Sequence, residues 1–226
     1  MLPLLTLALT LATAPPKTLA TPFAESGLLE GAHVVADPRT GLPRAVLGLS
    51  VPLGVPVDAV AARAALERLA PSLGFDARGL GAVAVSESRF GTVFSFELLA
   101  PTDGIPLPFL ERRVALRVQN GRVTTIHSDV VPTPSLTFGP AGLDAPDLAT
   151  ADDAAALATR QTGGVAGVAR AWALSLAPGH IEPIWRVPVV VLPFVDHRWV
   201  DVAMRGGRVI RDVPSAKDGH RVGGVR

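Results

Sequence analysis

The segment VALRVQNGRV, from Val114 to Val123, carries the clearest structural signal in the sequence. Its first half alternates apolar residues with alanine, arginine and glutamine, which is the period of a strand with one buried face. Asn120-Gly121 then ends the alternation, and an Asn-Gly step between two such runs is the strongest short-range sign of a hairpin turn. We therefore predict a β-hairpin in which residues 122–131 run back along 114–119, with positive φ at Asn120 and Gly121.

The residues before this hairpin show the same two-residue period. A strand that precedes a turn at 101–104 is predicted to carry four apolar side chains on one face, at Phe90, Phe94, Phe96 and Leu98. Further upstream, Asp37-Pro38 and Thr40-Gly41 indicate a turn between two extended pieces within 33–48.

A first helix is expected between this turn and the strands. Asp58 is a good N-cap, and the helix should reach about residue 70, where Pro71 and Gly74 are expected to end it. Its apolar residues step by three and four, so they form one stripe: Ala62, Leu66, Leu69 and Leu73. We expect this stripe to pack against the sheet.

A second helix and four strands are predicted in the rest of the chain. Thr150 can cap the helix, Asp152 and Asp153 favour its positive end, and Gly163-Gly164 ends it. The strands are expected at 168–176, 184–192, 198–204 and 208–213, with a tight turn at Gly206-Gly207 before the last.

The predicted fold class is α+β. Residues 132–146 hold four prolines and two glycines, which indicates a linker or a boundary. Because a helix and antiparallel strands are predicted on each side of it, we expect two subdomains, each an antiparallel sheet with a packed helix. The expected divisions are a signal peptide at 1–20, subdomains at 21–139 and 140–214, and a flexible tail at 215–226.

The start of the chain reads as a secretory signal. An apolar run from Leu2 to Leu11 is followed by small residues, and Thr18-Leu19-Ala20 is a candidate cleavage site. The run is too short to span a bilayer. We expect a secreted or periplasmic protein that begins near Thr21, without stable membrane insertion; a buried N-terminal segment is the alternative.

Composition narrows the classes of function. The 21 basic and 20 acidic residues nearly balance, and the basic residues form no cluster, so nucleic acid is not an expected partner. Cysteine is absent, which excludes disulfides, thiolate metal sites and a cysteine nucleophile.

No residue set in the sequence supports catalysis. The five histidines are too widely spaced for a zinc motif, and neither H-E-x-x-H nor G-x-S-x-G occurs. Asp152-Asp153 point to different faces of a helix, and Asp196-His197 is a lone acid–base pair in a predicted turn. We therefore expect no enzyme, no cofactor and no metal site. The three tryptophans, Trp172, Trp185 and Trp199, fall on successive predicted strands, where they can pack on the sheet or form a binding patch.

The first half of the chain resembles the fungalysin/thermolysin propeptide domain. ELLAPTDGIPL at 97–107 and VALRVQNGRV at 114–123 match that family's strand, G-[IV]-P turn, second strand and N-G-x-V hairpin. LGF at 73–75 and DPRTGLP at 37–43 are similar to its lead-in segments. The glutamine that usually precedes the G-[IV]-P turn is missing, since 97–100 reads ELLA.

The second half resembles a PepSY domain. Its short helix is followed by IWRVPV at 184–189, WVDV at 199–202 and RVI at 208–210, which are similar to that family's three strands. The two resemblances together cover about 33–213. Because the sequence ends at Arg226 without zinc ligands, we expect the zinc peptidase domain that follows in the family to be absent.

These resemblances imply a function that needs no chemistry of its own. In the family such domains assist folding of a metallopeptidase and inhibit it by covering its cleft. We therefore expect a non-catalytic propeptide-like protein whose partner is an exported zinc metallopeptidase, with Gly104, Ile105 and Pro106 in the contact surface. Two alternatives stay open: a module recruited to other extracellular or envelope proteins, and the front piece of a longer metallopeptidase precursor.

Overall fold

The computed structural model describes residues 29–130, 135–138, 142–177, 179–191 and 196–215. The predicted signal peptide lies outside these residues, as does the predicted tail after residue 215. Among the residues described, no helix is both long and apolar enough to cross a membrane.

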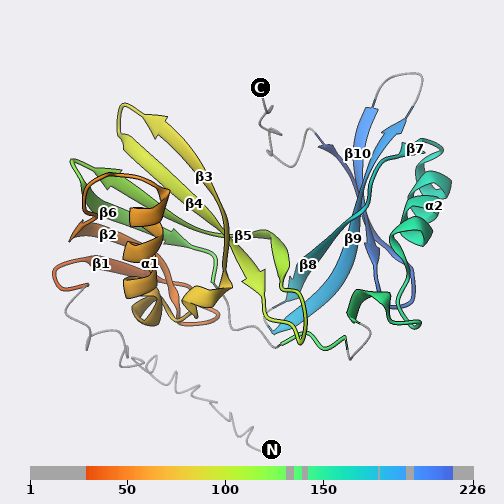
Figure 1. Cartoon of the computed structure of the whole chain (residues 1–226), viewed down its shortest axis with the longest axis horizontal. Helices are drawn as coiled ribbons and strands as arrows, with labels where there is room; N and C mark the ends of the chain where they lie inside the picture. The colour runs from red at the N-terminus through yellow and green to blue at the C-terminus, as the bar shows by residue number, and fades with distance from the viewer. Residues whose placement is uncertain (1–28, 131–134, 139–141, 178, 192–195, 216–226) are drawn as a thin grey trace, which may run out of the picture.

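The described residues form one sheet of eleven strands and two α-helices (Figure 1). The strands are β1 His33–Ala36, β2 Pro43–Pro52, β3 Leu80–Ser88, β4 Gly91–Ala100, β5 Leu107–Gln119, β6 Arg122–Ser128, β7 Val165–Ala166, β8 Arg170–Ala177, β9 His180–Val191, β10 Asp196–Ala203 and β11 Val209–Pro214. The helices are α1 Ala59–Leu73 and α2 Ala151–Thr162. The predicted α+β class is confirmed.

The long strand β5 joins the two sides of the molecule. The main strand order is β1-β2-β6-β5-β8-β9-β10-β11, with β4 and β3 also attached through β5 and with β7 paired to β9. All pairs are antiparallel except β5 with β8, which meet in parallel at Phe109 and Ala173. In Figure 1, β5 runs through the centre, with α1 and the N-terminal strands on one side and β8–β11 with α2 on the other.

The largest hydrophobic core draws on both sides of β5. Phe94, Phe96 and Leu116 belong to the same buried cluster as Ile181 and Met204. The predicted division into two subdomains near residue 140 therefore stays a prediction. Strand β5 pairs with strands from both halves of the chain, and the largest core contains residues from both.

Helix α1 begins where the sequence indicated and extends further than expected. The Asp58 carboxylate accepts a hydrogen bond from the Ala61 amide at 2.8 Å, and the predicted apolar stripe is fully buried. Pro71 does not end the helix: it lies in the last turn, and the helix continues to Leu73 before Gly74 caps it at φ 77°. A proline this close to the end removes one helical hydrogen bond and leaves few later ones to disturb.

The central hairpin is confirmed. Gln119 pairs with Arg122 across a two-residue loop, and Asn120 and Gly121 have φ of 50° and 68°. The prediction for Phe90 was wrong: it lies in the turn between β3 and β4 and is 54% exposed, whereas Phe94 and Phe96 are buried. The strand β3 was not predicted.

Replacing Gly121 with valine is expected to lower the free energy of unfolding by about 1–3 kcal/mol, because a β-branched residue strains a left-handed backbone. The matched control is Gly104→Val. Gly104 lacks the positive φ and has no atom within 4 Å of an added Cβ. Urea unfolding of both variants is the measurement, and equal midpoints would contradict the prediction.

Helix α2 covers one face of the C-terminal strands. Thr150 and Asp153 form the predicted capping box, and Gly163 ends the helix at φ 70°. Ala154 and Ala158 pack against four valines of β9 and β10: Val187, Val189, Val200 and Val202. The side chains on the opposite face of these strands do not belong to this cluster.

Candidate functional site

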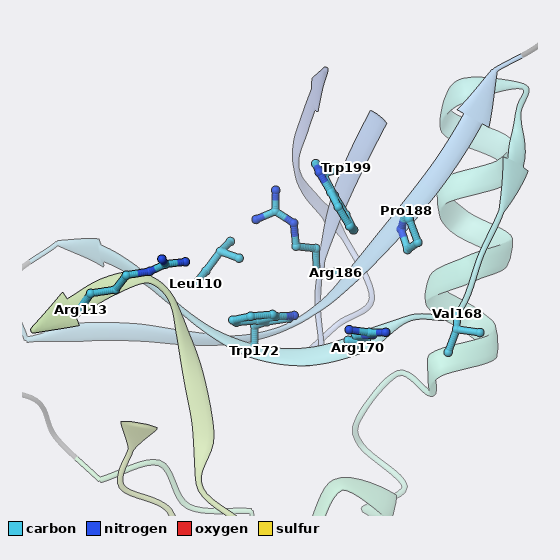
Figure 2. A pocket seen from close by; sticks show the side chains of 8 residues that line it. All are labelled: Leu110, Arg113, Val168, Arg170, Trp172, Arg186, Pro188 and Trp199. Carbon is cyan, nitrogen blue, oxygen red and sulfur yellow. The ribbon is translucent and has the colours of Figure 1, made fainter. Parts of the chain in front are cut away.

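A pocket of about 380 Å³ lies on the face of β8, β9 and β10 that faces away from α2 (Figure 2). It is lined by apolar, aromatic and guanidinium side chains: Leu110, Arg113, Val168, Arg170, Trp172, Arg186, Pro188 and Trp199. Pockets of about 300–1,000 Å³ with apolar walls and a few polar groups are typical ligand sites.

Strand alternation brings these side chains together. Arg170 and Trp172 are two residues apart on β8, as are Arg186 and Pro188 on β9, so each pair lies on one face. The register aligns them across strands, since Arg186 is paired with Arg170 and Pro188 with Trp199. The pairing of β8, β9 and β10 thus forms most of the pocket, and β5 adds Leu110 and Arg113.

A row of charged residues crosses the sheet, and two of its members, Arg170 and Arg186, line the pocket. In register, Arg170 on β8 is followed by Arg186 on β9, Asp201 on β10 and Arg211 on β11. The Asp201 side chain is 0% exposed; its Oδ1 lies 3.8 Å from Arg186 Nε, and its Oδ2 accepts a 2.6 Å hydrogen bond from Arg211 Nε. Asp201 therefore holds both neighbouring guanidinium groups in place.

A further ion pair connects this row to β5. Arg211 Nη1 donates to Glu111 Oε1 at 2.6 Å. Burial alone would lower the pKa of Arg211, but its hydrogen bonds with Glu111 and Asp201 outweigh burial and raise that pKa. In the strand order, β5 and β11 stand four strands apart, which in a flat sheet would be about 19 Å. The ion pair shows that this part of the sheet curls, with the pocket on its inner face.

Two of the three tryptophans belong to the pocket. The Arg186 guanidinium carbon lies 4.7 Å from the centre of the Trp199 ring, a cation–π contact. Trp172 packs against the small buried cluster of Leu110, Leu174 and Ile184. Trp185 points the other way, and its Nε1 donates to the Ala149 carbonyl at 2.7 Å. The interpretation that the tryptophans pack on the sheet is confirmed for Trp172 and Trp185, whereas the binding patch stays a prediction.

The predicted contact residues lie elsewhere. Gly104, Ile105 and Pro106 form part of the exposed turn between β4 and β5, and Ile105 is 78% exposed. None of them lines the pocket of Figure 2, and Pro106 borders a separate hollow.

Two acidic residues singled out in the sequence, Asp153 and Asp196, have structural roles. Asp153 caps α2, and hydrogen bonds from Thr150 lower its pKa. Asp196-His197 begins β10, and Asp196 accepts a hydrogen bond from Arg198 at 3.1 Å. In the described part of the chain, no three metal-ligating side chains gather into a site.

Comparison with known proteins leaves the family open. No family model matches the chain, and no curated protein sequence matches it. Among solved structures, the Bacillus megaterium YpeB C-terminal domain is similar at 10% identity and a TM-score of 0.37, over 81% of each chain. The YpmB protein from Bacillus subtilis is similar at 10% identity and a TM-score of 0.25, over 60% of this chain and 84% of its own. At these scores, neither likeness assigns the chain to a family.

The side chains of the pocket determine what it can do. Guanidinium and indole N–H groups donate hydrogen bonds, and the remaining side chains offer only apolar contact. Among the lining residues that the structure describes, no side chain is a carboxylate, a hydroxyl, a thiol or a lysine amine.

Proposed function

We propose that this protein is a non-catalytic module that binds a segment of another protein in the pocket formed by Trp172, Trp199 and their neighbouring arginines. The observation that carries the proposal is the combination of two tryptophans with Arg113, Arg170 and Arg186 around one hollow. Tryptophan and arginine are the residues most enriched at the energetic centres of protein interfaces.

The pocket is held in shape before any ligand arrives. Arg186 has only 5% of its side chain exposed, and it is fixed by Asp201 on one side and by the Trp199 ring on the other. A binding group that is already ordered loses less conformational entropy on association, which favours affinity.

The finer proposal concerns the partner. The sequence resemblance to propeptide domains supports an exported zinc metallopeptidase, which the protein would inhibit or help to fold. In this proposal the pocket and the exposed Gly104-Ile105-Pro106 turn both contact the peptidase. A recruited envelope module and the front piece of a longer precursor are the alternatives, and an H-E-x-x-H reading frame directly downstream would favour the latter.

The test is a titration of the purified protein against exported thermolysin-like peptidases. We expect no peptidase activity from the protein itself, with or without zinc. We expect it to slow a peptidase with micromolar affinity, about 8 kcal/mol, because binding in trans lacks the high effective concentration of a linked propeptide. Inhibition that persists after replacement of all five histidines would support occlusion over metal removal.

A double variant, Trp172→Ala with Trp199→Ala, tests the pocket itself. It should weaken inhibition about 30-fold or more, since truncation of central interface residues costs about 2 kcal/mol or more. Phe90→Ala is the matched control, because Phe90 is an exposed aromatic residue that does not line the pocket.

Two results would contradict different parts of this proposal. If no peptidase is slowed at about a hundred micromolar, the inhibitor proposal falls, and co-purification from culture supernatant tests the recruited module. If the double variant retains every partner that the unaltered protein binds, the pocket is not the binding site.

A further inference from the structure

We propose that the pocket recognises a carboxylate carried by an apolar peptide segment, either at its C-terminus or on an acidic side chain. This inference rests on the proposed function and adds the chemistry of the ligand. Three observations carry it: an unbalanced charge row, a lining that only donates hydrogen bonds, and two aromatic walls.

The charge row places two like charges directly opposite each other. Arg170 and Arg186 are register partners on β8 and β9, and like charges in that position destabilise a sheet. Asp201 already contacts Arg186 and Arg211. Arg170 forms no salt bridge with any residue that the structure describes. An anion bound between Arg170 and Arg186 would turn this repulsion into two charge-assisted hydrogen bonds.

The anion is favoured at the open end of the row. Arg170 is exposed and Arg113 is half-buried, whereas Arg186 is almost fully buried. Figure 2 shows Arg113 reaching toward the pocket from β5, on the side opposite Arg170. A carboxylate that enters the pocket is therefore surrounded by positive charge contributed by three strands, β5, β8 and β9.

The described residues that line the pocket have no side chain that could accept a hydrogen bond. Among the lining residues, arginine and tryptophan donate, and leucine, valine and proline do neither. A carboxylate on an apolar residue needs donors and apolar contact, which are both present. A nucleotide base or a side-chain amide also presents N–H groups, which would find no acceptor side chain here, so these ligands are disfavoured.

The two tryptophans provide contact surface for the apolar part of the ligand. Trp172 and Trp199 both border the hollow, with Pro188 and Leu110 beside them. Tryptophan offers a large rigid surface for an aliphatic or aromatic ligand group. A volume of about 380 Å³ limits the buried part of the ligand to one or two residues.

The test uses short peptides that differ only in charge. The first pair is acetyl-Gly-Ala-Leu-Phe as the free acid and as the amide; the second is acetyl-Gly-Glu-Phe-Ala amide and its glutamine counterpart. Binding to the full chain is followed by intrinsic fluorescence, which tryptophan alone supplies because the chain has no tyrosine. We expect at least one acid form to bind about tenfold or more tightly than its neutral partner. The pair that shows the difference identifies the source of the carboxylate.

Two arginine variants test whether Arg170 causes the preference for the acid form. Arg170→Gln should reduce the preference for the acid form about tenfold. It should leave the melting temperature unchanged or slightly raised, which distinguishes ligand recognition from a structural role. Arg117→Gln is the matched control: Arg117 is an exposed arginine of β5 that does not line the pocket, and this variant should bind like the unaltered protein.

Three outcomes would overturn the inference: equal binding of acid and neutral peptides, tighter binding of adenosine monophosphate than of either acid peptide, or no peptide binding at about 10 mM. None of these outcomes by itself removes the proposed function. That proposal is judged separately, by whether the tryptophan double variant loses its protein partner.

Discussion

Replacing Asp201 with alanine is expected to lower the free energy of unfolding by about 3–5 kcal/mol, the usual cost of removing one partner from a buried ion pair. The reason is that Asp201 is fully buried and contacts two arginines. Without it, Arg186 would keep its charge in a site with 5% side-chain exposure. The measurement is urea unfolding followed by tryptophan fluorescence.

Asp196→Ala is the matched control for this variant. Asp196 begins the same strand and also pairs with an arginine, Arg198, but its side chain is 45% exposed. Ion pairs at such exposure contribute about 1 kcal/mol or less. If both variants lose the same stability, the charge row does not stabilise the curled sheet, and the shape of the pocket must come from packing alone.

Replacing Gly91 with alanine is expected to cost about 2–6 kcal/mol. An added Cβ would lie 2.2 Å from the Val118 carbonyl oxygen, and Gly91 has φ of 110°, where other residues are strained. The strained backbone accounts for about 1–3 kcal/mol, and the overlap with a neighbouring strand for about as much again. We expect β4 to separate from β5 near Val118, with a marked fall in the melting temperature.

Gly48→Ala separates the two causes. Gly48 lies within β2 at φ 75°, and an added Cβ there meets no atom within 4 Å. This variant should therefore show the cost of backbone strain without the overlap. A Gly91→Ala protein as stable as Gly48→Ala would mean that the two strands can move apart without loss.

Local signals in the sequence predicted those parts of the fold that depend on neighbours along the chain. Asn120 and Gly121 form their turn because both residues readily adopt positive φ. Thr150 and Asp153, which are three residues apart, cap the start of α2 by bonding to each other's backbone amides. Pro71 shows the limit of such rules, because its effect depends on where the helix ends. The strand β3 escaped prediction because most of its side chains are small or polar and only Leu80 is buried.

The pocket could not be assembled from the sequence, since it depends on how β8, β9 and β10 pair. Trp172 and Trp199 are brought onto one face by register, whereas Trp185 falls on the other. The sequence did contain one signal for the pocket face. Arg170 and Trp172, and likewise Trp199 and Asp201, are two positions apart and therefore lie on the same face of their strand. Alternation identifies a face, but it does not show that α2 covers the opposite one.

The ion pair between Glu111 and Arg211 makes the pocket dependent on β11, the strand of the described part of the chain that is synthesised last. Residues on β5 are synthesised about a hundred positions before the arginine that ties them to the far end of the curled sheet. A nascent chain that has reached only β10, or a molecule cut by a protease before β11, would have both pocket tryptophans but no Arg211 to hold Asp201. Ligand binding would thus report that β11 is present, and products that stop or are cut before this strand would bind the partner more weakly and compete less for it.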